Sequence, residues 1–211
     1  MEVAVVVTGG AGLTPAVLEE LPDRPWVVAA DSGVDHAVAL GLRVDLVVGD
    51  LDSATPDALA ESNAPVERHP ADKDATDLEL ALRAAASRPG IRRVIVLGGH
   101  GGRLDHLLGN AAVIASPQWA HLQVEWVAGS DRAVVIHDVA RLHGTPGDPV
   151  SLVPVGGPVT GVHTHGLRWP LRGATLSPFS SLGVSNRMLR SVAEVRVGSG
   201  VLLAVQPGAV V

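Results

Sequence analysis

Up to about residue 130, short runs of apolar, often β-branched residues alternate with stretches of helical character. The run at 3–7 contains no polar residue, which is the pattern of a strand buried on both faces of a sheet. The strand-like runs are 3–7, 26–30, 45–48, 94–97 and 122–127, and the helix-like stretches lie near 15–20, 34–40, 78–87 and 104–115. This alternation predicts a mostly parallel, Rossmann-like sheet flanked by helices.

The pattern changes beyond residue 130, where helical character is lost and short β-like runs are separated by Gly and Pro. These runs are 133–137, 150–155, 159–165, 193–197 and 201–205. Such spacing is typical of an antiparallel β-sandwich. We therefore predict two domains, an α/β domain over residues 1–130 and an all-β sandwich domain over residues 131–211.

The composition restricts the classes of function. The 211 residues are 46% hydrophobic and 18% charged, so the chain can bury a core. A net charge of −6 and only 2% aromatic residues argue against nucleic-acid binding through a basic face or a stacking platform. The absence of cysteine excludes disulfides and thiolate metal sites. The first apolar run is too short to span a bilayer and lacks the basic flank of a signal peptide, so we expect a cytoplasmic protein with no membrane segment.

Aspartates stand just beyond several of the strand-like runs. They are Asp31, Asp50, Asp52 and Asp105, and Asp77 stands where a helix should begin. The carboxyl ends of parallel strands meet at one edge of a sheet, where such sheets bind ligands. Two unit charges ~4 Å apart repel by roughly 4 kcal/mol at an effective dielectric near 20, so several acids gathered there need a cation. Hard oxygen ligands of this kind indicate Mg²⁺.

A glycine-rich loop, GGHGGRLDH at 98–106, follows the run at 94–97. Glycines allow a ligand to approach the backbone closely, and N–H groups at the start of the following helix favour phosphate. Arg103 can form a two-pronged contact with phosphate oxygens, and Asp105 can hold a cation on the same phosphate. The loop therefore predicts binding of a polyphosphate.

The segment DKDATD at 72–77 has two interpretations. Thr76 and Glu79 have the spacing of a helix-capping box, and Asp is favoured in a first helical turn. The alternative places Asp77 in the site, beside Lys73, which is the only lysine of the chain. The segment GDLDS at 49–53 is similarly open to two readings, a polar turn or a pair of metal ligands.

Other phosphate-handling classes fit less well. The DxDx[TV] pattern of haloacid-dehalogenase-type phosphatases needs Thr or Val where this chain has Ala54. The turn TGGAG at 8–12 lacks the full G-x-G-x-x-G spacing of dinucleotide-binding proteins, and no Walker A sequence occurs. From pattern alone, the segment at 180–186 is a hairpin turn.

Taken in order along the chain, several segments resemble the thiamine pyrophosphokinase family. They are ADSGVDH (30–36), VDLVVGDLDS (44–53), DKDATDLELAL (72–82), LGGHGGRLDHLLGN (97–110), SLVPVGGPVTGVHTHGLRWPL (151–171) and SSLGVSN (180–186). The resemblance implies an α/β catalytic domain, a C-terminal β-sandwich that binds thiamine, and a homodimer. It also implies Mg²⁺-dependent transfer of the diphosphoryl group of ATP to the hydroxyl of thiamine, which yields thiamine diphosphate and AMP.

The resemblance also assigns roles to individual residues. The acids expected to hold Mg²⁺, and with Arg103 to form the catalytic group, are Asp50, Asp52, Asp77 and Asp105. The residues expected on the ATP side are Asp31, Lys73, Thr76, Gly101, Gly102 and Arg103. The residues expected to bind thiamine are Ser185 and Asn186.

Two positions depart from the family pattern. Ser32 stands where the family often has glycine, and Arg187 stands where an acid often follows the Ser-Asn pair. The second departure places a cation near the expected pocket for a cationic ring. Two alternatives to thiamine phosphorylation therefore stay open, a diphosphotransferase that acts on another heterocyclic alcohol such as a pterin, and a non-catalytic nucleotide- or thiamine-binding module.

Overall fold

The computed structural model describes residues 2–210, which form two compact units. The first unit contains the chain up to Ile114 together with His121–Gly129 and Val210, and the second contains Ala115–Ala120 and Ser130–Ala209. In the described part of the chain, no helix is both long and apolar enough to cross a membrane.

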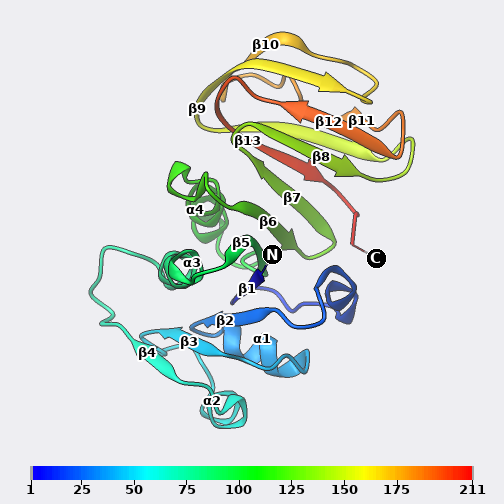
Figure 1. The fold of residues 1–211 in the computed structure, drawn as a ribbon. Helices are drawn as coiled ribbons and strands as arrows, with labels where there is room; N and C mark the ends of the chain where they lie inside the picture. Colours follow the sequence, from blue (N-terminus) through cyan, green and yellow to red (C-terminus); the bar gives the residue numbers. More distant parts are fainter. Residues whose placement is uncertain (1, 211) are drawn as a thin grey trace. The chain divides into compact units, whose positions relative to one another are not determined.

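The first unit is built on a parallel sheet with the strand order β4-β3-β2-β1-β5-β6 (Figure 1). Its strands are β1 (Glu2–Thr8), β2 (Trp26–Ala30), β3 (Leu46–Gly49), β4 (Val66–Arg68), β5 (Ile91–Leu97) and β6 (Gln123–Ala128). Its helices are η1 (Pro15–Glu20), α1 (Gly33–Ala39), α2 (Pro56–Ser62), α3 (Asp77–Ser87) and α4 (Leu104–Ile114). Every strand expected from the sequence is present, and the additional strand β4 is a short, exposed edge strand.

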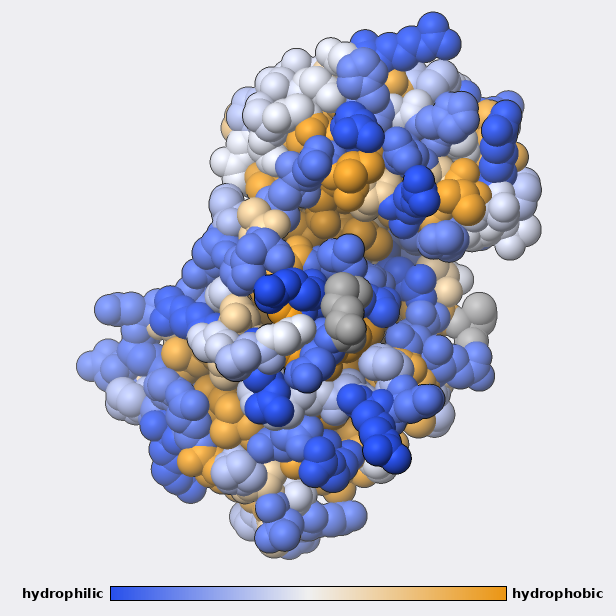
Figure 2. Space-filling view, in the orientation of Figure 1, coloured by the Kyte–Doolittle hydropathy of each residue, from blue (hydrophilic) through white to orange (hydrophobic). Residues whose placement is uncertain are grey.

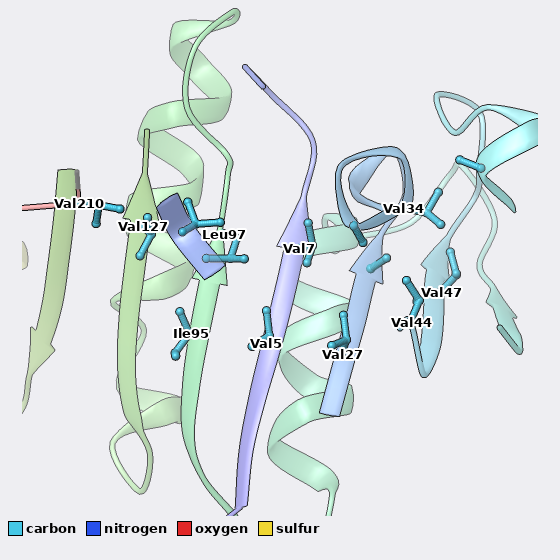
Figure 3. Close-up of a cluster of buried hydrophobic side chains, with 14 residues drawn as sticks. Val5, Val7, Val27, Val34, Val44, Val47, Ile95, Leu97, Val127 and Val210 are labelled. Carbon is cyan, nitrogen blue, oxygen red and sulfur yellow. The ribbon is translucent and has the colours of Figure 1, made fainter. Parts of the chain in front are cut away.

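Alternate residues of the strands point to opposite faces of this sheet. One face carries Val5 and Val7 of β1, which pack with Val34 of α1 in a cluster that also includes residues of η1 and α2 (Figure 3). The helix α3 packs against β1, β2, β3 and β5, and its buried residues lie outside that cluster, so it covers the other face. Helices on both faces explain why the buried middle of β1, the whole of β2 and the second half of β5 are apolar.

The second unit consists of antiparallel strands with their own core. Its elements are η2 (Pro117–Trp119), β7 (Asp131–Ile136), β8 (Val139–His143), β9 (Pro149–His165), β10 (Arg172–Leu176), β11 (Asn186–Arg187), β12 (Val192–Arg196) and β13 (Ser199–Gln206). The predicted fold class, an α/β unit followed by an all-β unit, is confirmed.

The strand β9 differs from the sequence prediction, which divides it into runs at 150–155 and 159–165. The structure has one strand that pairs with β13 over its first part and with β10 and β12 over its second. Gly156, which has a φ of 74°, lies between the two parts. A glycine at this conformation lets the strand change direction without ending, so that one strand contributes to both sets of pairings.

Candidate active site

Three carboxylates meet at the carboxyl edge of the parallel sheet. Asp31 follows β2 directly, and Asp50 and Asp52 lie in the loop after β3. Since β2 and β3 are neighbours in the sheet, these loops are adjacent, and one carboxylate oxygen from each residue lies within 4.8 Å of the others. The family resemblance assigns Asp50 and Asp52 to the metal and Asp31 to ATP, whereas the geometry groups all three, as their positions after the strands predict.

A fourth carboxylate, from Asp77 at the first turn of α3, lies beside this group. A side chain on Gly49 would bring a Cβ atom to 3.0 Å from Asp77 Oδ1 and 3.3 Å from Asp31 Cβ. Gly49 also has a φ of 148°, a backbone angle that residues with a Cβ atom rarely adopt. The glycine at the end of β3 therefore leaves the space in which Asp31 and Asp77 approach each other.

The backbone of both acidic loops is strained where it turns. Asp31 and Leu51 have φ angles of 46° and 64°, although neither is glycine. Such conformations cost of order 1 kcal/mol or more and persist where the surroundings impose them. The Asp31 N–H donates to Val48 O at 2.9 Å, and the side chain of Leu51 packs against the core of the first unit. These contacts fix both acidic loops at the sheet edge and so fix the positions of their carboxylates.

Lys73 is the cation of this group. Its Nζ atom lies 2.8 Å from Asp50 Oδ2 and 3.2 Å from Asp77 Oδ1, and the side chain is only 13% exposed. The hydrogen bond from Lys73 lowers the pKa of Asp50, and the same bond raises the pKa of Lys73. The ammonium thus joins the loop after β3 to the start of α3.

Asp31 has no such partner. Burial raises the pKa of its carboxyl, and the backbone hydrogen bonds from Ser32 and Ser53 oppose that shift. Its Oδ1 atom is buried without a hydrogen-bond partner, and Asp77 Oδ1 has the ion-pair contact with Lys73 but no aligned hydrogen bond. A buried carboxylate oxygen that lacks a donor, such as Asp31 Oδ1, suits a hard divalent cation.

The glycine-rich loop between β5 and α4 lies beside the turn after β1. Gly99 N–H donates to Gly9 O at 2.8 Å, and Ala11 N–H donates to His100 O at 2.7 Å. The side chain of Asn110 on α4 fixes the loop through a hydrogen bond from Nδ2 to Gly99 O at 3.0 Å. The turn at 8–12 therefore supports the loop that the sequence assigns to phosphate.

Arg103 and Asp105 form a two-pronged pair on this loop. Arg103 donates from Nε to Asp105 Oδ1 at 3.1 Å and from Nη2 to Asp105 Oδ2 at 2.6 Å. The pair lowers the pKa of Asp105 to about 2, although both side chains are more than half exposed. Asp105, which the sequence assigns to the metal, is not among the three acids whose oxygens gather after β2 and β3.

Thr76, Asn186 and Arg187 form hydrogen bonds within the protein. Thr76 is the N-cap of α3, and its Oγ1 accepts from Glu79 N–H at 3.2 Å, so Thr76 caps the helix while Asp77 of the same segment lies beside the acidic group. In the second unit, Asn186 is buried, accepts from Trp169 N–H at 3.1 Å and donates to Trp169 O at 2.8 Å. Ser185 is exposed with a φ of 61°, and Arg187 donates to Gly147 O at 2.8 Å.

A contact between α1 and the start of α2 supports the acidic loop. Asp35 of α1 accepts hydrogen bonds from the backbone N–H of Thr55, at 3.2 Å, and from its hydroxyl. Thr55 is also the N-cap of α2 and precedes Pro56 at the first helical position. The Thr-Pro pair signals the helix start in the sequence, but the tie to α1 depends on the packing of the two helices.

Comparisons with known proteins match both units. The family model described as "Thiamin pyrophosphokinase, catalytic domain" matches residues 18–125, and "Thiamin pyrophosphokinase, vitamin B1 binding domain" matches residues 137–202. The thiamine pyrophosphokinase of Bacillus subtilis is 23% identical over 210 residues, which cover 96% of each chain. Thiamine pyrophosphokinase 1 of rice is 25% identical over 162 residues, and this match spans 71% of the present chain and 61% of the rice protein.

Solved structures show the same fold. The crystal structure of thiamine pyrophosphokinase from Bacillus subtilis superposes with a TM-score of 0.84 at 21% identity and covers 98% of this chain and 99% of its own. The structure from Geobacillus thermodenitrificans gives a TM-score of 0.82 at 25% identity, with 98% and 97% covered. Because the catalytic-domain model alone matches half of the sequence, the chain belongs to the thiamine pyrophosphokinase family.

Proposed function

We propose that this protein is a Mg²⁺-dependent thiamine diphosphokinase, which transfers the diphosphoryl group of ATP to the hydroxyl of thiamine. The observation that carries the proposal is the group of Asp31, Asp50 and Asp52, whose oxygens lie within 4.8 Å of one another at the carboxyl edge of a parallel sheet. Family membership supplies the substrates, since both a catalytic and a vitamin B1 binding model match.

The donor set fits Mg²⁺. The available ligands are carboxylate oxygens, and the buried Asp31 Oδ1 has no hydrogen-bond donor. Asp31, Asp50 and Asp52 would hold the ion, and we extend the set to Asp77 and Asp105 because the family resemblance assigns them this role. A bound Mg²⁺ ion neutralises charge on the polyphosphate and so favours attack at phosphorus.

The residues of the chain then position the reactants. Backbone N–H groups of the loop at Gly101 and Gly102 bind phosphate oxygens, and the Arg103 guanidinium pairs with the charge that develops on them. The thiamine hydroxyl oxygen forms a bond to the β-phosphorus, while the bond from that phosphorus to the oxygen bridging the α-phosphorus breaks. AMP leaves with the bridging oxygen, and the hydroxyl proton is released.

We assign thiamine binding and self-association to the second unit. Large apolar residues are exposed along one stretch of it, including Phe179 at 97%, Leu182 at 49% and Val184 at 50%. Apolar residues are visible at the surface among its strands (Figure 2). Exposed apolar stretches of this kind favour a binding surface, so we propose a homodimer. Separately, we propose a cytoplasmic location.

The test is incubation with ATP, MgCl₂ and thiamine, followed by chromatography of nucleotides and thiamine phosphates. We expect AMP and thiamine diphosphate in equal amounts. ADP with thiamine monophosphate, or inorganic phosphate released from monoesters, would refute the proposal, and AMP formed only with a pterin alcohol would replace thiamine as the substrate.

Asp50→Asn should abolish turnover. Its matched control is Asp57→Asn, which changes an exposed acid in the first turn of α2. We expect the control variant to retain the wild-type rate.

A further inference from the structure

Lys73 occupies an unusual position among the acids. A lysine side chain that is only 13% exposed is seldom found without a partner, and here two carboxylates from different elements hold it. Asp50 and Asp77 are themselves only 16% and 24% exposed. In the described part of the chain, Lys73 makes the only ion pairs with the four carboxylates of Asp31, Asp50, Asp52 and Asp77.

One oxygen of Asp50 is already in contact with a cation. The Lys73 ammonium lies 2.8 Å from Asp50 Oδ2, at hydrogen-bond distance. A Mg²⁺ ion takes its oxygen ligands at about 2.0–2.1 Å, so a metal on the same oxygen would lie close to the ammonium and repel it. The ammonium and a divalent ion therefore oppose each other at this oxygen, and each weakens the binding of the other.

We propose that Lys73 is an internal counterion, which occupies the cation position of the free protein and competes with Mg²⁺ for Asp50. This inference rests on the proposed function, because it takes the four acids as a divalent-cation site. The lysine side chain suits the role, since its ammonium is a compact charge on a flexible stem and can release one carboxylate without breaking a planar, two-pronged contact. Once released, the ammonium is free to contact the polyphosphate.

Competition has a consequence that a purely structural ion pair does not have. Replacing Lys73 by methionine removes the counterion, so the metal-free protein should become less stable because four acids then repel one another. The same replacement should strengthen Mg²⁺ binding, because the competitor is gone. A lysine that only braces the loop would weaken both properties when removed.

The chain offers a direct readout, because Lys73 is its only lysine. Amine acylation of the full-length wild-type protein, followed by mass spectrometry, reports the accessibility of this one side chain apart from the N-terminus. Mg²⁺ alone, at concentrations that raise the melting temperature, should accelerate Lys73 acylation severalfold as the ammonium leaves Asp50. An unchanged or slower rate, or no effect of Mg²⁺ on melting, would overturn the proposal.

The second experiment follows melting temperature as MgCl₂ is added to chelator-treated protein. For Lys73→Met we expect a lower melting temperature without metal. We also expect the Mg²⁺ midpoint, which is the MgCl₂ concentration that gives half of the rise in melting temperature, to be about tenfold lower than in wild type. This is the size expected for one charge that acts on a divalent ion through strong screening. Lys73→Arg keeps the charge and should give a midpoint near that of the wild type. A higher or unchanged midpoint in Lys73→Met contradicts competition.

Arg93→Met is the matched control. Arg93 is a partly buried cation on β5 that pairs with Glu125 at 2.7 Å. Its loss should lower the melting temperature but leave the Mg²⁺ midpoint and Lys73 acylation unchanged. Neither measurement uses thiamine or ATP. If AMP forms as proposed while both measurements fail, the counterion role is wrong and the proposed function stands.

Discussion

Replacing Asp31 by asparagine should stabilise the metal-free protein. The Asp31 carboxylate has oxygens within 4.8 Å of those of Asp50 and Asp52, and it forms no ion pair in the described part of the chain. At that separation two unit charges repel by roughly 3.5 kcal/mol at an effective dielectric near 20, and exposure of Asp52 to water reduces this to about 1–2 kcal/mol. The weaker hydrogen bonds to asparagine offset part of the gain.

The expected net effect of Asp31→Asn is about 1 kcal/mol, which raises the melting temperature of a chain of this length by about 2–4 °C. Burial raises the pKa of Asp31 in the folded state, so the folded protein holds this proton at pH values where the unfolded chain has lost it. Wild-type stability therefore falls as the pH rises through that window. The advantage of the variant is complete above the window and disappears below it, where the carboxyl is neutral in both states.

The assay is urea unfolding of wild type and Asp31→Asn in chelator, at several pH values from neutral to acid. Asp57→Asn serves as the control, because it removes an equal charge at an exposed site without acidic neighbours in the group. Saturating Mg²⁺ should reverse the ranking, since the wild type then binds the ion more tightly. A variant that is less stable than wild type at neutral pH without metal, or an advantage that does not change with pH, would refute the reasoning.

Three further substitutions have specific expected results. Gly49→Ala should cost about 2–4 kcal/mol in urea unfolding, because the new Cβ meets Asp77 Oδ1 at 3.0 Å in a backbone conformation that favours glycine; an effect below about 1 kcal/mol would contradict this. Arg103→Lys should lower kcat more than it raises KM in the thiamine assay, because an ammonium cannot form the two-pronged contact, and a change in KM alone would assign Arg103 to ground-state binding of ATP. Asn186→Ala removes the two hydrogen bonds that this buried side chain forms with the backbone of Trp169 and should destabilise the protein by about 1–3 kcal/mol. It should also weaken thiamine binding, measured by calorimetry, with ATP binding nearly unchanged; equal loss of both would contradict a role confined to the second unit.

The fold could be predicted from the sequence where burial imposes a clear pattern of apolar residues. The central strands β1, β2 and β5 are buried on both faces over 4–7, 27–30 and 94–97, so these parts appear as unbroken apolar runs. β4 has the sequence Val-Glu-Arg and is exposed throughout, so nothing in its pattern distinguishes it from a loop. The two runs within β9 appear separate because Gly156 and Gly157 read as a turn, although the strand continues through them.

The sequence could predict which residues form the candidate site but not which contacts they make. The sequence places Asp31 and Asp50 after strands, but their proximity depends on β2 and β3 being neighbours, which is a property of the sheet order. The ion pairs of Lys73 depend on the path of the segment between β4 and α3, which has no periodic pattern. The sequence also groups Asp105 with the other acids, whereas the structure pairs it with Arg103 at an exposed position.

The two cations of the site differ in how readily they can change partners. Arg103 and Asp105 are 71% and 63% exposed, so water solvates both groups as the pair opens, and the guanidinium can turn to phosphate at little cost. Lys73 and Asp50 are 13% and 16% exposed, so separating them without a replacement leaves a poorly solvated carboxylate among other acids. A divalent ion supplies that replacement, and it arrives most readily with the polyphosphate that needs the ammonium. Metal and nucleotide should therefore bind cooperatively around Lys73, whereas the pair of Arg103 and Asp105 can open in water without a divalent ion.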